Sequence, residues 1–152
     1  MTDETAAHAF RTAFHAAATA LWAGTPVQVI LGNPATYQAD DVVEIGAVNA
    51  TQDPATFGSQ RSREEQLELE VVISIFRAGG IEREADVFDR AYQLLEDLAL
   101  FCRVTDTTVG GTVRSCALTS NAYGSGNSDQ TLAAGRIGVV VAKFTAQARI
   151  RT

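Results

Sequence analysis

Four glycines within sixteen residues, from Tyr123 to Gly138, form the first pattern in this sequence that suggests chemistry. Glycine-rich loops bind phosphates when they lie between a strand and the N-terminus of a helix. Here the loop precedes "RIGVVVAKF", a β-branched run that predicts a strand, and neither GxxxxGK[ST] nor GxGxxG is present. We therefore interpret residues 121–133 as a mobile polar tip between two antiparallel strands, which becomes ordered on meeting a partner.

Two histidines and two cysteines are the obvious candidate metal ligands. His8 and His15 lie seven residues apart on a predicted helix, about 10 Å along its axis, which is too far to bind one ion. Cys102 and Cys116 lack CxxC spacing and nearby ligand residues, so we interpret them as buried thiols. A disulfide between them would need an oxidising compartment. We expect no metal site and no cofactor.

Glutamates are concentrated between residues 64 and 70, and paired carboxylates are typical of acid–base catalysis. Glu68 and Glu70 share one face of a predicted strand, yet nothing around them indicates a substrate pocket. We interpret them as part of a solvated or intersubunit face. The serines lack a GxSxG pattern. The sequence therefore predicts no catalytic residue, and we expect a protein that is not an enzyme.

Composition indicates one globular domain spanning residues 1–152, with 46% hydrophobic and 20% charged residues. The net charge is −6 and Lys143 is the one lysine, which argues against a basic patch that grips nucleic acid. An acidic surface would let DNA move past without binding. We expect no signal peptide and no membrane span, because no run approaches roughly 20 apolar residues.

Periodicity places the expected elements along the chain. A helix that ends at Gly24 is expected first, with Thr2 or Asp3 as the cap at its start and an apolar stripe that includes Leu21. Short strands follow at 27–31 and 41–48. Residues 49–63 lack periodicity and predict an exposed arm or a long hairpin connection.

The clearest strand is "EEQLELEVVISIFR", in which Leu67, Leu69, Val71, Ile73 and Ile75 alternate with the other face. An amphipathic helix with Phe88 in its apolar stripe is expected over residues 82–102, and strands over 112–123 and 135–150. This order predicts an α+β fold: a mixed or antiparallel sheet of about four to five strands packed by two helices, with an extended arm or hairpin.

The chain resembles the lambda-type tail terminator proteins of long-tailed siphophages. Three parts carry the resemblance: "EEQLELEVVISIF", "READVFDRAYQLLEDLALF" after a Gly-Gly break, and the closing pair "GGTVRSCALTSNAYGSG" and "GRIGVVVAKFTAQARI". These are patterns of residue type and order that cover nearly the whole chain. The last strand, ending in "KFTAQARI", is also similar to that family.

The resemblance implies a structural virion protein in the tail–neck region, assembled in the host cytoplasm as a hexameric ring. Such a ring caps the tail tube, ends its polymerisation and joins the tail to the head. The implied partners are further copies of the chain, the tail tube protein and a head-completion or neck protein, with DNA passing through the lumen. No catalysis, cofactor or membrane contact is implied, and no functional residue carries over.

Interface residues are therefore expected from the arm, the acidic strand and the loop. They are Phe57, Arg61, Arg63, Glu68, Glu70, Tyr123, Asn127, Asp129 and Arg136. Arg61 and Arg63 could meet Glu68, Glu70 or Glu96 of the next subunit. Two other readings stay open: a head-completion protein of the same phage class, and a small ligand-binding domain or enzyme with a pocket between sheet and helix.

Overall fold

A computed structural model describes residues 4–32, 40–56, 59–125 and 135–151, and within the strands it leaves the side chains of residues 54–61, 125 and 151 undescribed. One five-stranded sheet in the order β1-β2-β3-β5-β4 forms the body. The strands are β1 (Gln28–Leu31), β2 (Asp41–Thr56), β3 (Ser59–Ala78), β4 (Ser115–Ser125) and β5 (Gly135–Arg151). Only the β1–β2 pair is parallel, so the sheet is mixed, as the sequence predicts.

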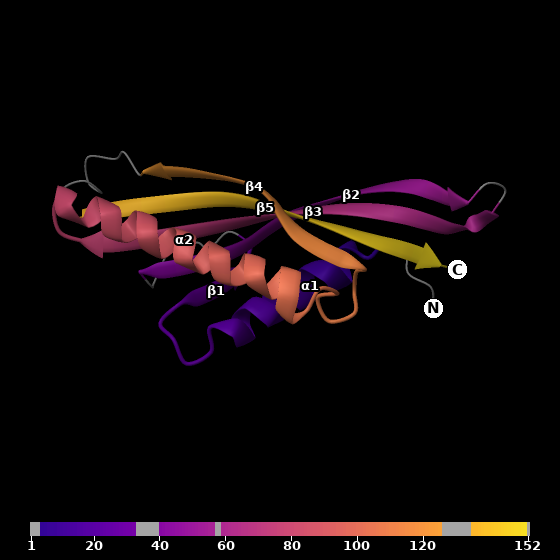
Figure 1. Ribbon diagram of the computed structural model, residues 1–152, viewed down its shortest axis with the longest axis horizontal. Coiled ribbons are helices and arrows are strands. Elements are labelled where there is room, and N and C mark those ends of the chain that lie inside the picture. The colour runs from indigo at the N-terminus through magenta and orange to yellow at the C-terminus, as the bar shows by residue number, and fades with distance from the viewer. Residues whose placement is uncertain (1–3, 33–39, 57–58, 126–134, 152) are drawn as a thin grey trace.

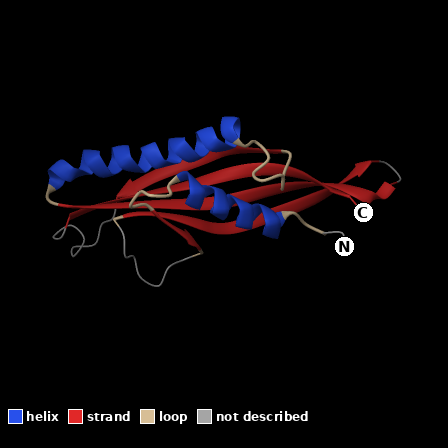
Figure 2. Cartoon of the chain, turned by 90° about the horizontal axis from the view of Figure 1, so that it is seen from below, coloured by secondary structure: helices blue, strands red, loops and turns tan. Residues whose placement is uncertain are grey.

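Both helices cover the same face of the sheet, α1 (Ala7–Leu21) over β1 and β2 and α2 (Glu84–Leu100) over β3 and β5 (Figures 1 and 2). A 3-10 turn, Ile81–Arg83, precedes α2, and a π-helical turn, Phe101–Thr105, follows it. The predicted α+β fold with two helices on one sheet is confirmed. The opposite face of the sheet carries no helix of the described chain and is called the open face below.

The core lies between the sheet and the helices. The alternation predicted for β3 is confirmed, because Leu67, Leu69, Val71, Ile73 and Ile75 are all fully buried on the helix side. Their counterparts from the other elements complete a single cluster, which includes Phe10, Phe14, Leu94, Leu98, Val140 and Phe144. Phe14 meets Phe144 edge to face, with ring centroids 5.2 Å apart. These contacts tie α1 to the centre of the sheet.

The helix stripes differ from the predicted ones in detail. Directly after α1, Trp22 is buried and continues the line of Phe10, Phe14 and Ala18, whereas Leu21 is exposed. In α2, the buried line runs through Val87, Ala91, Leu94 and Leu98, and Phe88 is 44% exposed. A wide apolar stripe exceeds what one flat sheet can cover, so the outermost apolar side chains stay at the surface.

The long hairpin is the main correction to the predicted elements. Residues 49–56 and 59–63 are strand: Asn49 lies opposite Glu68, and Pro54 lies opposite Arg63. Of the two alternatives predicted for residues 49–63, the hairpin is therefore the right one. In Figure 1 this hairpin extends past the ends of both helices. Both of its faces lie beyond the helix layer, and register shifts at Ile45/Val48 and Pro54/Thr56 interrupt the alternation. The sequence pattern therefore lacked the period that identifies a strand.

Candidate interaction surfaces

A buried carboxylate joins the sheet to α2 at one end of the molecule. Asp41, at the start of β2, is only 4% exposed. Arg77 of β3 donates to it at 2.6 Å and Arg90 of α2 at 2.9 Å. Burial raises the pKa of Asp41, but hydrogen bonds and charges from the two arginines outweigh burial and hold the pKa below its ordinary value. This cluster fixes α2 on the sheet and has its charges internally satisfied.

A second buried carboxylate holds the start of α1. Glu65 of β3 is 1% exposed and accepts hydrogen bonds from the Thr5 hydroxyl at 2.6 Å and the Ala6 amide at 2.7 Å. Gln52 of β2 donates to the same carboxylate at 2.7 Å. Helix N-termini leave amides without intrahelical partners and favour negative charge. A residue sixty positions away from Thr5 therefore does what the predicted caps Thr2 or Asp3, which lie outside the described residues, were expected to do.

Three aromatic rings connect α2 to the edge strand β4. Phe88 lies with its ring centroid 5.0 Å from Tyr92 and 4.9 Å from Tyr123. The Tyr92 hydroxyl donates to Asn121 at 2.9 Å, and the Tyr123 hydroxyl donates to Glu84 at 3.2 Å. Tyr123, a predicted interface residue, thus has a role within the subunit.

Ion pairs cover much of the open face and the base of the hairpin. Glu64 accepts from Arg114 at 2.6 Å and from Arg149 at 2.9 Å. The Glu68 Oε1 atom lies 3.3 Å from Lys143 Nζ. Nearby, burial and the charge of Glu70 raise the pKa of Glu44 above its ordinary value. This face is charged, with Glu64 and Glu68 paired, which suits a surface in contact with water.

The predicted interface residues do not gather into one site. Phe57, Asn127 and Asp129 lie outside the described residues, as does most of the predicted mobile tip, and the side chain of Arg61 is not described either. Arg63 is paired with Glu4 of its own chain, on the helix side. Glu68 and Glu70 lie on the open face, and Arg136 lies opposite Arg77 at the far end of β3. The expected contact between Arg61 or Arg63 and a neighbour's glutamate stays a prediction.

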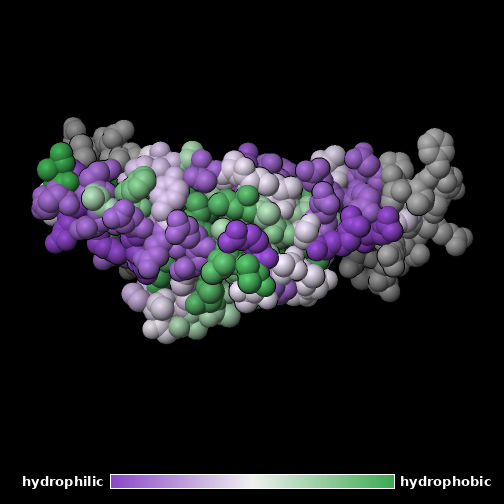
Figure 3. Space-filling view, in the orientation of Figure 1, coloured by the Kyte–Doolittle hydropathy of each residue, from purple (hydrophilic) through white to green (hydrophobic). Residues whose placement is uncertain are grey.

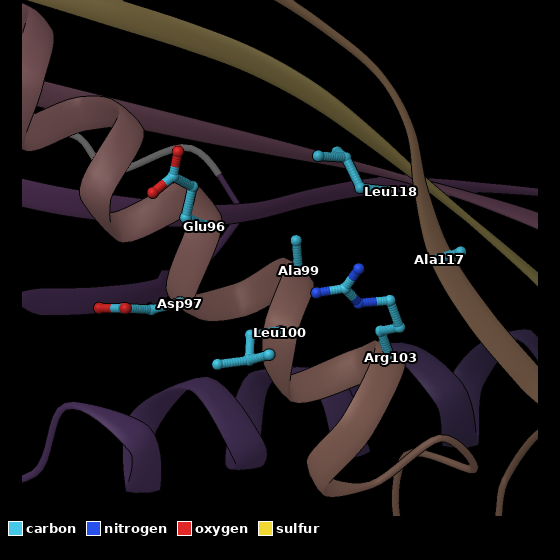
Figure 4. Close-up of a pocket in the computed structure, with 7 residues that line it drawn as sticks. All are labelled: Glu96, Asp97, Ala99, Leu100, Arg103, Ala117 and Leu118. Atoms are coloured by element: carbon cyan, nitrogen blue, oxygen red, sulfur yellow. The ribbon is translucent and has the colours of Figure 1, made fainter.

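Sequence reasoning missed a hollow between the end of α2 and β4 (Figure 4). Its volume is about 540 Å³, and it is lined by Glu96, Asp97, Ala99, Leu100, Arg103, Ala117 and Leu118. In Figure 4 the Arg103 guanidinium lies between the helix and β4. Arg103 forms no ion pair among the described residues. The hollow therefore offers apolar surface together with a cation and carboxylates that have no partner on the described chain.

Exposed hydrophobic side chains surround this hollow. Leu100 is 49% exposed and Val104 is 64% exposed. Figure 3 shows hydrophobic surface gathered near the middle of the helix-covered face, where α2 ends. On the opposite edge of the sheet, Leu31 at the end of β1 is 49% exposed and Leu21 is 38% exposed. The run "LALFCRV" extends an apolar stripe past the end of the helix, and this was the available sequence signal.

The candidate ligands give no metal centre in the described part of the chain, where no three His, Cys, Asp or Glu side chains come together. Cys102 and Cys116 are both free and buried, as predicted. The hydrogen bond with Cys116, together with burial, raises the pKa of the Cys102 thiol well above its ordinary range. The Cys102 thiol is therefore protonated, and both buried cysteines serve as core side chains. Within the described residues, no helix has the length and hydrophobicity needed to cross a membrane.

Comparison with known proteins gives a similarity of structure without a similarity of sequence. No protein-family model matches the chain, and no curated protein matches it. A chain in a solved structure described as the virion of a native gene transfer agent particle matches with a TM-score of 0.53 and 13% sequence identity. The match covers 99% of this chain and 100% of that chain. The two chains therefore share a fold over nearly their whole compared length.

Proposed function

We propose that this chain is a structural virion protein of a phage-type particle, and specifically the terminator of its tail. It forms a ring, six subunits in the sequence-based expectation, that caps the tail tube, stops its growth and provides the surface to which the head's neck attaches. The observation that carries this proposal is the end-to-end similarity to a chain of a gene transfer agent virion. The resemblance of the sequence pattern to tail terminators supports the finer role.

The surfaces of the subunit suit this role. The open face carries Glu44, Glu64, Glu68 and Glu70. Glu64 is balanced by Arg114 and Arg149, and Glu68 by Lys143. Lining a channel with such a face lets DNA pass without the clustered cations that would hold its phosphates. The proposed role is non-catalytic and needs no cofactor, and its place is the tail–neck region of the virion, after assembly in the host cytoplasm.

Control of tube length is the property that tests the proposal most directly. Purified tail tube protein is polymerised with and without this chain, and tube lengths are measured by electron microscopy. We expect tubes to stop growing, and a ring to appear at one tube end, when the chain is added. Unchanged tube lengths with rings attached to neck components would favour the head-completion alternative. No binding to either partner would reject the virion role.

The ligand-binding alternative has a specific location, because Glu96, Asp97 and Arg103 line the hollow beside β4. That alternative predicts a monomer whose melting temperature rises with a small charged ligand. Light scattering over a range of protein concentrations, with and without tail tubes, distinguishes it from the ring. A mass near six subunits, alone or on tubes, supports the terminator.

A further inference from the structure

The two edge strands of the sheet are the ones that carry no charge. β1 reads "QVIL" and β4 reads "SCALTSNAYGS", without Asp, Glu, Lys, Arg or Pro. The three inner strands hold all the charged residues of the sheet, such as Glu44, Glu68 and Lys143. Proteins that stay monomeric normally protect the edges of their sheets with charges, prolines or very short strands, because a free edge strand can pair with another chain. β1 is itself a short strand of four residues, whereas among the described residues the eleven-residue edge of β4 is interrupted only by the register shift between Leu118 and Ser120.

Strand direction shows how two copies fit together. β1 and β2 run the same way, and each later neighbour in the order β3, β5, β4 reverses direction. β4 therefore runs opposite to β1. In a ring with rotational symmetry about one axis, neighbouring subunits keep the same orientation along that axis. The β4 edge of one subunit then meets the β1 edge of the next in antiparallel direction, which continues the alternation of the inner sheet.

Side chains at the two edges match as well. Leu31 lies opposite Ile45, which is buried under the helices, so Leu31 is on the helix side of β1. Leu118 lies opposite the buried Phe144, so it is on the helix side of β4, where the hollow is. Across the sheet of one subunit, the strand pairs place Leu31 level with Asn121, three residues along β4 from Leu118. Joining the edges with that offset brings the half-exposed Leu31 of one copy to the hollow between α2 and β4 of the other. The hollow is concave and partly apolar, and Leu31 is a protruding apolar side chain.

We propose that β4 of one subunit pairs antiparallel with β1 of a second copy of this chain, placing Leu31 of that copy in the hollow lined by Leu100 and Leu118. This inference rests on the proposed ring and assigns the two different surfaces that a head-to-tail contact needs. It joins the sheets of all subunits into one continuous sheet without free edges. Formation of the lateral contact then depends on the uncharged edges of the subunit.

Cysteine cross-linking tests the pairing directly. Leu31→Cys is combined with Ala117→Cys or with Leu118→Cys, and the assembled protein is oxidised with diamide, alone or on tail tubes. We expect the double variant with Leu118→Cys, which lies on the same side of the sheet as Leu31, to give a ladder of covalent multimers under denaturing, non-reducing conditions. Ala117 lies on the open face, so the double variant with Ala117→Cys should cross-link less. The single variants are the matched controls and should stay monomeric, since the native thiols are buried.

A charge at the edge gives a second readout. Ser120→Lys places a cation on β4, and Gln147→Lys places the same side chain on the inner strand β5, where the residue is also exposed. We expect Ser120→Lys to lower the mass of the assembly to that of the monomer, or to raise at least tenfold the concentration at which it forms. Gln147→Lys should leave the mass unchanged, and both variants should keep the melting temperature of the monomer.

The outcomes separate this inference from the proposed function. A ring that forms normally in Ser120→Lys and gives no cross-link in either double variant overturns the edge pairing but leaves the terminator role intact. A covalent dimer in Ala117→Cys alone would show that β4 pairs with itself, and it also overturns the inference. A wild-type chain that stays monomeric with and without tubes overturns both.

Discussion

Asp41 is the residue on which the attachment of α2 most depends. It is almost fully buried, and its two arginine partners come from different elements. Asp41→Asn keeps the shape but removes the charge that both guanidinium groups share. We expect the free energy of unfolding to fall by about 2 kcal/mol at neutral pH, since hydrogen bonds to charged groups contribute roughly that much. Urea denaturation measures this loss, and Asp89→Asn on the exposed face of α2 is the control.

The same substitution has a predictable pH dependence. The folded-state pKa of Asp41 is lower than its ordinary value of 3.8, so the folded state holds the proton less well than the unfolded chain. The stabilisation is therefore present above the ordinary pKa and is lost as pH falls through the lower, folded-state pKa. We expect the stability difference between wild type and Asp41→Asn to be constant near pH 7 and to shrink below about pH 4. A difference that stays the same in acid would contradict the charge-based account.

Trp22 presents the opposite case, a buried polar atom without a partner. The side chain is 6% exposed, and its indole Nε1 has no hydrogen-bond acceptor among the residues that the structure describes. Trp22→Phe removes that donor and leaves a small cavity, two effects of about 1–3 kcal/mol that oppose each other. We therefore expect a net change in unfolding free energy below about 1 kcal/mol. Trp22→Ala should cost about 3–5 kcal/mol, because it removes the whole ring from the core.

Among the elements, the start of α1 depends on a carboxylate that belongs to β3. Glu65→Ala removes the acceptor of the Thr5 hydroxyl and of the Ala6 and Gln52 donors together. We expect a loss of about 2 kcal/mol and faster amide hydrogen exchange in the first turn of α1, because buried donors are left unsatisfied. Glu70→Ala on the open face of the same strand is the control. Unchanged exchange in the first turn of α1 would show that Glu65 does not fix this helix.

The elements also show what the sequence determines by itself. Strict alternation identifies β3 residue by residue, since one of its faces is buried under the helices. The hairpin extension lacks that one-sided burial, so its pairing to residue 63 has no periodic signal. Glu65 resembles its neighbours Glu64 and Glu68 in sequence. Only the approach of α1, sixty residues earlier, makes it a buried cap.

The interaction surfaces were predictable to a smaller extent. The sequence indicates an acidic strand and a polar loop, but it does not show which residues meet across the fold. The hollow forms between residues 96–103 and 117–118, which join only when α2 lies over the sheet. The sequence shows that β4 carries no charge. This composition indicates a surface for pairing only when the strand order shows that β4 is an edge strand.

At the scale of the whole molecule, the long axis separates two further surfaces. The strands run along this axis, with the hairpin at one end and the turn that leads into α2 at the other (Figure 1). Subunits joined through β1 and β4 would therefore direct these two ends roughly toward opposite sides of a ring. The turn carries Ile81, which is 77% exposed. A large apolar side chain at an end of the subunit suits a contact with the tube or the neck.

Ile81→Ser tests whether the two kinds of contact are independent. We expect it to weaken binding of the ring to its axial partner about tenfold or more, since burying an isoleucine side chain is worth about 1.5–3 kcal/mol. The mass of the ring should not change. Leu100→Ser, in the hollow, should do the reverse and weaken the ring itself. Co-sedimentation with tail tubes and light scattering measure the two effects separately. If both variants impaired both properties equally, lateral and axial contacts would share one surface, and the separation by axis would be wrong.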